Sequence, residues 1–398
     1  MRSRHLGSIR DIGANEWNAL ATDYPFLRHE FLAALEDTGC ASAATGWTPS
    51  HLLLEDAQGL AAAAPLYAKA HSWGEFVFDF AWARAWEGRG LHYYPKLVLA
   101  IPFTPASGPR VLVRAGADAA ALRQAALAAI AARTTAQGCS SAHALFIDAP
   151  LRESAAAAGW LLRRDCQFRW RNRGYRDFED FLAGFSAEKR KKARRERRRV
   201  AEQGIGFATL DGTTIDAARL DLAWRLHADT FARHGHTPYL NRACFRQLAA
   251  VLGPAMVFKF AECGGRAVGV AIFFRSADTL YGRYWGADDA WHSLHFEACY
   301  HQGIEYCIEQ GLAHFEPGTQ GEHKVARGFE PVHTWSAHWL EDAALRRAVA
   351  QHLRLEGAAV DEYAAAVAAH TPFRRDPVPG SAVPGGAGPA GDPAGGPR

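Results

Sequence analysis

The sequence predicts an α+β protein in which helices form layers over a sheet, and it predicts that this arrangement occurs twice along the chain. The order of elements is the first observation, because each half ends in a helix, a strand, a short helix and a last strand. Spacing is the second observation: Gly159 stands eleven residues before Trp170, and Gly328 stands eleven residues before Trp339. Together these two agreements favour an internal duplication.

Apolar segments and turn residues define the elements of the first half. Residues 56–59 separate two short apolar strands, and Gly138 ends an alanine-rich helix. We expect helices over residues 15–38, 118–137 and 151–158, and strands over residues 51–55, 60–68, 97–101, 143–148 and 160–172.

The second half follows the same order with one longer helix, which Gly311 ends. Residues 262–266 form the turn of a predicted hairpin. We expect helices over residues 215–233, 242–252, 292–310 and 321–327, and strands over residues 257–261, 267–274, 279–285, 313–316 and 332–340.

The length of 398 residues is enough for two domains of ordinary size, and 48% hydrophobic with 22% charged residues is typical of a globular protein. We place the two domains at residues 1–172 and 173–372. The remaining residues, 373–398, are dominated by glycine, proline and alanine, which cannot bury enough apolar surface to order a chain. We therefore expect a disordered tail.

The chain is expected to be cytoplasmic. Residues 1–13 are basic but contain no apolar stretch of the kind found in a secretory signal. The alanine-rich segment 118–138 is interrupted by Arg123, Gln124 and Arg133, so it does not predict a transmembrane helix.

Cysteine usage points to reduced thiols. The seven cysteines are odd in number and include no C-x-x-C pair, which argues against a disulfide framework and against a structural zinc site. Eighteen histidines include no H-E-x-x-H motif. We expect neither a dedicated metal site nor a tightly bound cofactor.

Residues 314–329 (HFEPGTQGEHKVARGF) hold the densest group of candidate site residues. A short apolar strand ends at Pro317 and Gly318, and titratable side chains follow at once. If residues 321–327 are helical, His323 and Arg327 lie on one face with Lys324 beside them. Loops that carry such groups on a rigid scaffold are frequent sites of binding and catalysis. The alternative is a solvated surface connection with Gly328 as a helix cap.

The chain resembles the GNAT acyltransferases, and in particular their FemAB branch and the bacterial family associated with peptidoglycan biosynthesis and recognition. The helix, helix, hairpin, strand, long helix, strand, short helix, strand order carries this resemblance. Four motifs also carry it: Tyr93-Tyr94-Pro95-Lys96, Pro102-Phe103-Thr104-Pro105, Pro238-Tyr239-Leu240 and residues 316–329. The resemblance implies two tandem GNAT-like domains, each with a mixed, mainly antiparallel sheet between helices.

The resemblance also implies N-acyl transfer from a coenzyme A thioester or an aminoacyl-tRNA ester to an amine, with a cell-wall precursor or another small molecule as the acceptor. A GNAT that binds coenzyme A carries a glycine or alanine where this chain has Asp288, and a carboxylate there would oppose a pyrophosphate. This departure favours a different donor, such as aminoacyl-tRNA, or a degenerate site.

Acyl transfer to an amine needs a proton acceptor, donors for the oxyanion and cations for anionic substrate groups. His323 is the predicted proton acceptor, because its ordinary pKa is near 6.5, and Glu316 would hold the amine or orient the imidazole. Two other interpretations stay open, in which Glu316 caps a helical turn and His323 only faces solvent. The predicted substrate-binding residues are Lys324, Arg327, Gln320, Glu322, Tyr94, Lys96 and Tyr239.

Positive charge is concentrated in a predicted helix over residues 186–200. Residues 186–199 hold nine basic and two acidic side chains, a net charge of +7 that leaves −4 for the rest of a chain whose total is +3. Such a helix repels itself and needs counter-anions: nucleic acid, membrane phosphate or acidic residues of the same chain. The predicted anion contacts are Lys189, Arg190, Lys192, Arg194, Arg195 and Arg198.

Two functional hypotheses follow. The first is an N-acyltransferase whose partners include the amine acceptor and tRNA. The second is a binding module without catalysis, which uses the basic helix to hold RNA, a phosphorylated precursor or the phosphates of a membrane surface. In the first hypothesis His323 is essential, whereas in the second only the cations of the helix matter.

Overall fold

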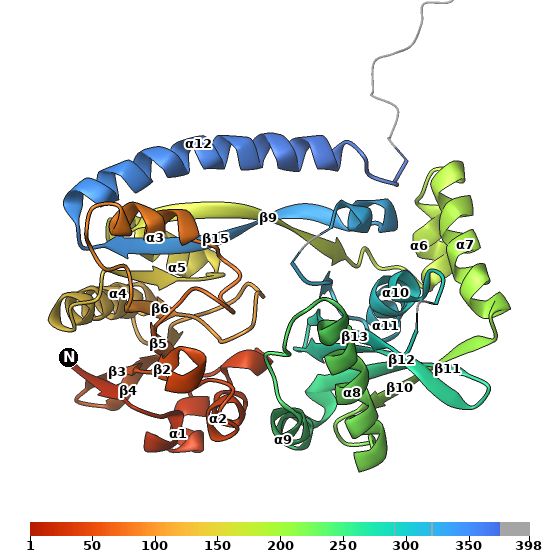
Figure 1. Cartoon of the computed structure of the whole chain (residues 1–398), viewed down its shortest axis with the longest axis horizontal. Coiled ribbons are helices and arrows are strands. Elements are labelled where there is room, and N and C mark those ends of the chain that lie inside the picture. Colours follow the sequence, from red (N-terminus) through yellow and green to blue (C-terminus); the bar gives the residue numbers. More distant parts are fainter. Residues whose placement is uncertain (290, 320, 375–398) are drawn as a thin grey trace, which may run out of the picture.

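The computed structural model describes residues 1–289, 291–319 and 321–374. Two halves lie side by side, and one long helix runs along both of them (Figure 1). Among the described residues the helices are α1 (Ala14–Asn18), α2 (His29–Asp37), α3 (Phe80–Glu87), α4 (Ala119–Ala136), α5 (Ala149–Ala157), α6 (Phe178–Ala183), α7 (Ala187–Glu202), α8 (Ala217–Arg233), α9 (Arg242–Leu252), α10 (Leu294–Phe296), α11 (Gln302–Glu309) and α12 (Ala343–Ala368).

Most strands belong to one sheet that continues from one half into the other. Its strands, in spatial order, are β10 (Ile205–Asp211), β11 (Met256–Cys263), β12 (Arg266–Arg275), β13 (Thr279–Ala287), β14 (His314–Glu316), β9 (Leu161–Arg171), β15 (Glu330–Leu340), β8 (Ser141–Ala144), β6 (Lys96–Leu99), β5 (Leu66–Lys69) and β2 (Trp47–Pro49). A smaller sheet in the first half contains β1 (Arg2–Leu6), β3 (His51–Asp56), β4 (Gly59–Ala64) and β7 (Leu112–Val113).

The halves exchange their last strands at the centre of the large sheet. Strand β9 of the first half pairs with β14 and β15 of the second half, and β15 in turn pairs with β8 of the first half. In the β9–β15 register Asp165 lies opposite Thr334, 169 positions later in the chain (334 − 165). The two tryptophans, Trp170 and Trp339, have the same separation (339 − 170). A pseudo-twofold axis therefore passes through the Asp165–Thr334 pair.

Apolar packing joins the two halves. The ring of Phe26, from the first half, lies 5.3 Å from that of Phe274 and 5.2 Å from that of Tyr281 in the second half, both measured between centroids. All three are buried in one continuous core. Burial of such large aromatic side chains dominates core energetics, so the two halves should unfold together.

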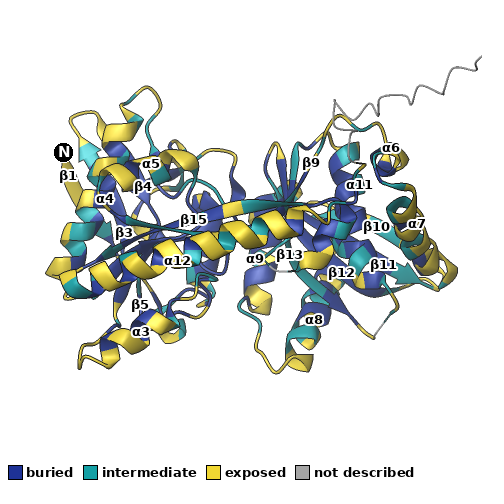
Figure 2. Ribbon diagram, turned by 90° about the horizontal axis from the view of Figure 1, so that it is seen from above, coloured by how far each residue is buried: buried dark blue, intermediate teal, exposed yellow. Residues whose placement is uncertain are grey.

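The predicted layered α+β class is confirmed, with helices over a mixed, mainly antiparallel sheet. Helix α12 was not predicted from the sequence. Asp342 is its N-cap, and the Asp342 side chain accepts a hydrogen bond from the amide of Leu345. Buried residues of α12 pack toward the sheet, and its outer side is exposed along its length (Figure 2).

No helix among the described residues is long and apolar enough to cross a membrane. Residues 375–398, most of the predicted tail, lie outside the described residues.

Candidate functional site

Strands β13 and β14 begin side by side and then part. They pair in parallel only from Thr279 opposite His314 to Tyr281 opposite Glu316. Beyond this point β13 continues to Ala287, whereas the segment that follows β14 turns away at Pro317 and Gly318. Part of the edge of β13 is therefore left without a neighbouring strand on the β14 side.

A bulge in β13 lies where β13 and β14 separate. Ile272 of β12 pairs with Tyr284 and Phe273 pairs with Gly282, so Arg283 is one extra residue on β13. A bulge bends and twists its strand, and bulges are frequent beside active sites. The guanidinium of Arg283 donates a hydrogen bond to the carbonyl of Phe103, which ties the bulge to the first half.

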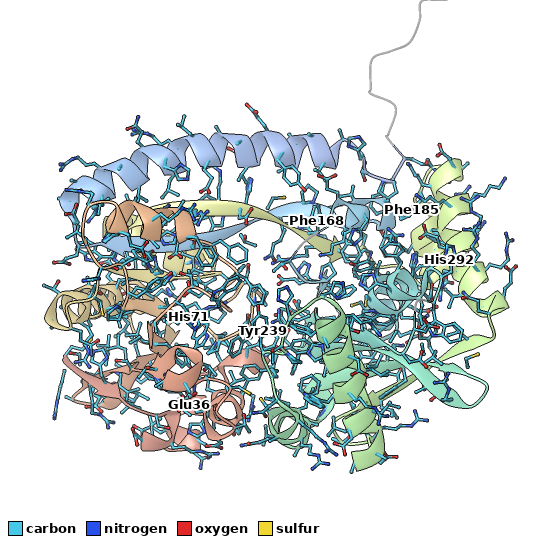
Figure 3. All side chains as sticks on the ribbon, viewed as in Figure 1. Glu36, His71, Phe168, Phe185, Tyr239 and His292 are labelled. Carbon is cyan, nitrogen blue, oxygen red and sulfur yellow. The ribbon has the colours of Figure 1, made fainter. Side chains whose placement is uncertain are left out.

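A cavity of about 220 Å³ lies where β13 and β14 separate. The second half supplies most of its wall, from β12, β13, α8 and the helix that starts at Leu294. The first half adds Phe76, Phe103 and Pro105. Tyr239 also lines the cavity, lies between the two halves in Figure 3, and stacks on Phe103 at 5.0 Å between centroids. A largely apolar pocket between halves with a few polar groups is the usual form of a small-molecule site.

The long helix beside the cavity contains a π-helical turn, Glu297–His301, between α10 and α11. Such turns occur mostly as single interruptions of α-helices, often at functional sites. Here it presents Cys299 and Tyr300 to the cavity. Burial raises the pKa of the Tyr300 hydroxyl, which therefore stays protonated near neutral pH.

His323 lies behind Tyr300. The predicted short helix is present as the 3-10 segment η6 (Glu322–Arg327), and Nε2 of His323 is 2.9 Å from the hydroxyl oxygen of Tyr300. Partial burial lowers the pKa of His323, and the charges of Lys324 and Arg327 lower it further. A neutral imidazole accepts the Tyr300 hydrogen on Nε2 and carries its own proton on Nδ1.

Lys324 is buried, with 2% of its surface exposed, and forms no ion pair within the described ranges. Its Nζ donates to the carbonyl of Gly318 at 2.8 Å, and Gly318 lines the cavity. Burial lowers the pKa of Lys324 to about 8. A buried ammonium without a carboxylate partner is costly, which marks this residue as a functional candidate.

Arg327 points toward the basic helix. Its guanidinium donates to Glu196 of α7 at 2.9 Å and lies 3.7 Å over the ring of Phe296. A second guanidinium N–H donates to the carbonyl of His323 at 2.7 Å. The structure thus brings His323, Lys324 and Arg327 together, and Arg327 fixes the backbone that carries the imidazole.

Glu316 does not contact His323. Its carboxylate accepts a hydrogen bond from Arg169 of β9, and burial raises its pKa. The imidazole is oriented instead by Tyr300. Glu316 closes the end of β14 beside the parting, and its second oxygen, Oε2, has no hydrogen-bond partner among the described residues.

The other predicted substrate contacts lie in different places. Glu322 lines a second hollow, of about 560 Å³, together with Asp165 and Tyr363. This hollow shares Phe76 and Thr319 with the cavity. Gln320 lies outside the described residues.

Lys96 and Tyr94 belong to a buried polar network in the first half. The Lys96 ammonium donates to Ser72 at 2.8 Å, to Glu75 at 2.8 Å and to Asp79 at 2.5 Å. The Tyr94 hydroxyl lies 2.9 Å from the Ser72 hydroxyl. Lys96 therefore fixes the loop before α3, which carries Phe76 into the cavity, and neither Lys96 nor Tyr94 is among the described residues that line that cavity.

Acidic residues of the same chain neutralise part of α7, which forms the outer edge of the second half (Figure 1). Arg194 pairs with Glu179 at 2.5 Å, Arg197 with Glu297 and Glu305, and Arg198 with Glu202. Arg190 donates only a long hydrogen bond, 3.4 Å, to a carbonyl. Six cations of α7 have no ion pair in the described part of the chain: Lys189, Arg190, Lys191, Lys192, Arg195 and Arg199.

Asp288, which we expected to oppose a pyrophosphate, lies at the end of β13 and is paired with Arg266 at 2.5 Å. Its other oxygen accepts a hydrogen bond from Trp291 at 2.9 Å. The carboxylate charge is therefore compensated within the chain.

Two layered units with exchanged strands, and a cavity where β13 and β14 part, define a tandem α+β protein with a candidate small-molecule site. The chain belongs to the FemAB-like family, described as peptidoglycan biosynthesis/recognition, whose model matches residues 8–375. The predicted family and the predicted pair of tandem GNAT-like units are thereby confirmed. A search of curated proteins finds no match.

Three solved structures share the fold at low identity. FemX is 10% identical with a TM-score of 0.52, and the alignment covers 88% of this chain and 100% of FemX. The C-terminal domain of a protein described as a lysylphosphatidylglycerol synthetase, from Agrobacterium fabrum, is 11% identical with a TM-score of 0.50, covering 91% and 98%. A protein of unknown function from Bacteroides thetaiotaomicron is 12% identical with a TM-score of 0.50, covering 85% and 100%.

The sequence does not indicate Arg283, Phe76 or Tyr300 as site residues. Tyr300 is 23 positions from His323, and no local pattern links them. Phe76 adopts φ +61°, a conformation that bulky residues rarely take and that no sequence signal indicates here.

Proposed function

We propose that this protein is an N-acyltransferase, which moves an acyl or aminoacyl group from a coenzyme A thioester or a tRNA ester to an amine of a cell-wall precursor. The observation that carries the proposal is the cavity between β13 and β14 with the Tyr300–His323 pair on its wall. Family membership supports a transferase and supports a peptidoglycan precursor as acceptor.

In the proposed reaction the acyl end of the donor lies in the cavity. The acceptor nitrogen attacks the acyl carbonyl carbon, a C–N bond forms, and the C–S or C–O bond to the donor breaks. The nitrogen loses a proton to the Tyr300 oxygen while the Tyr300 hydrogen passes to Nε2 of His323. The leaving thiolate or alkoxide then takes up a proton, and Tyr300 and His323 return to their neutral starting forms.

Lys324 supplies positive charge beside the turn at Gly318. We propose that this ammonium stabilises the negative charge that develops on the carbonyl oxygen, a contribution that is large when the charge is buried and held in place. The protein would in this way retain a costly buried cation because the transition state uses it.

The acceptor is proposed to enter through the second hollow, because that hollow and the cavity share Phe76 and Thr319. The carboxylates of Asp165 and Glu322 line this approach and favour a positively charged amine. The ammonium form of the amine must lose one proton before the nitrogen can attack. The Tyr300–His323 pair accepts the second proton, which the nitrogen loses as the C–N bond forms.

For α7 we propose contact with phosphates of the donor, because six cations on this helix lack an ion pair within the described ranges. This contact would suit a tRNA donor and gives the second candidate, a phosphate-binding module without catalysis, its only specific support. We place the reaction in the cytoplasm, where both donor classes occur.

The test combines two donor sets with one acceptor. Purified protein is incubated with acyl-coenzyme A or aminoacyl-tRNA and a UDP-linked muropeptide, and the acceptor mass is measured. An added acyl or aminoacyl mass that disappears with His323→Ala supports the enzyme. Tight RNA binding without any mass change in either set supports the module instead.

A further inference from the structure

We infer that the cavity between β13 and β14 selects an uncharged, bulky apolar acyl side chain, aliphatic or aromatic, and rejects cationic ones. The inference rests on the proposed function, since it concerns the acyl group that the cavity would hold. It goes further by naming the chemical class of that group.

The wall of the cavity is mainly aromatic. Rings come from separate segments of both halves: Phe76, Phe103, Phe231, Tyr239, Tyr284 and Trp285. Ala271 and Ile272 of β12 add aliphatic surface. Rings from this many segments give apolar contact on several sides, which favours a ligand group that gains by leaving water.

The volume suits a branched or aromatic group. The cavity measures about 220 Å³. For comparison, an apolar cavity of about 150 Å³ in another protein holds one benzene molecule. An acetyl or alanyl group would leave much of this space without contacts, whereas a phenyl or isobutyl group would fill more of it.

Apart from Arg283, the titratable groups on the wall are neutral near pH 7. Burial lowers the pKa of His295 to about 4, raises the pKa of Tyr284 to about 12, and raises the pKa of the Cys299 thiol. The lining residues that the structure describes include no carboxylate. A cationic acyl side chain would therefore lose its hydration without gaining a counter-ion.

Arg283 is the one lining residue of the described set that keeps a full charge. Its guanidinium donates a hydrogen bond to the carbonyl of Phe103 and lies 5.6 Å from the ring centroid of Tyr284. Its positive charge repels a cationic side chain.

The test measures the binding of matched donor analogues to the full chain by calorimetry. One set consists of 3′-aminoacylamino-3′-deoxyadenosines that carry phenylalanyl, leucyl or lysyl groups. The other consists of phenylacetyl-, isovaleryl- and trimethylammoniobutyryl-coenzyme A. In whichever set binds, the two apolar members should bind at least about tenfold more tightly than the cationic one.

Two variants locate the selectivity. Phe231→Ala enlarges the cavity and should reduce the preference for the aromatic analogue, whereas Phe207→Ala, on β10 and outside the lining, should leave it unchanged. Equal or tighter binding of the cationic analogue overturns the selectivity but still supports a donor site in the cavity. No binding in either set removes the donor site itself, and both proposals fail.

Discussion

The hydroxyl of Tyr300 and Nε2 of His323 lie 2.9 Å apart, one on the wall of the cavity and the other on the segment that follows β14. The contact joins two elements that are separated by the parting of the strands. It gives the site a polar pair that can move a proton between the cavity and solvent.

Tyr300→Phe should lower the rate of transfer by about 10²-fold or more, the scale of general acid–base catalysis. Phenylalanine keeps the ring and its contact with Phe296, so folding should not change. Single-turnover transfer measures the effect. An unchanged rate would remove Tyr300 from proton transfer and leave His323 to act without it.

The acid limb of the pH–rate profile should lie below pH 6.5. His323 must be neutral to accept a proton, and its pKa is lowered by burial and by its two cationic neighbours. Activity should therefore persist as the pH falls through 6.5 and disappear at lower pH, when the imidazole is protonated. In Lys324→Met the limb should move upward, toward the ordinary value for histidine. A limb that stays in place would contradict the assigned base.

Lys324→Met should raise stability at pH 7 by about 1–3 kcal/mol while it lowers activity. The folded-state pKa of Lys324 is about 8, below its ordinary value of 10.5, so the folded state pays for the ammonium below pH 8. This cost fades as the pH rises from 8 to about 10.5. Denaturant unfolding of both proteins at pH 7 and pH 10 measures the difference, which should shrink at pH 10.

Lys96→Met should destabilise the protein by about 3–5 kcal/mol, because it leaves the carboxylates of Glu75 and Asp79 buried without their cation. The loop that carries Phe76 should loosen, and donor binding should weaken with it. Thermal unfolding gives the first effect. A variant as stable as the parent would show that the network contributes little to this loop.

Gly282→Ala should weaken donor binding. A Cβ there would lie 3.2 Å from Cα of Pro317, so the parting strands would have to shift. Gly206→Ala on β10 is the matched control, because a Cβ at Gly206 meets nothing within 4 Å. The Michaelis constant for the donor should rise in the first variant alone. An equal rise in both would place the effect outside the cavity.

Much of the second half could be predicted from the sequence because its signals are local. Gly311 ends the long helix, and the dense polar segment after β14 indicates His323 and Lys324 as candidate site residues. Trp170 and Trp339 each stand eleven residues after a glycine, which predicts the repeat. The two tryptophans are 169 positions apart, and Asp165 and Thr334, which pair in the register of β9 against β15, have the same separation.

The strand exchange, the bulge and the partners of the site residues could not be predicted. The bulge at Arg283 depends on how β13 pairs with β12, and the exchange depends on strands about 169 positions apart. Glu196, the partner of Arg327, is 131 positions away. Such contacts arise from tertiary packing, which a single sequence does not display.

His323 is central to the proposed reaction, because it accepts the proton that Tyr300 passes on. The most direct measurement is single-turnover transfer by His323→Ala beside the parent protein, with donor affinity measured on the same samples. We predict a loss of about 10²-fold or more in rate with donor affinity within about twofold of the parent. Transfer at the parental rate would contradict the account.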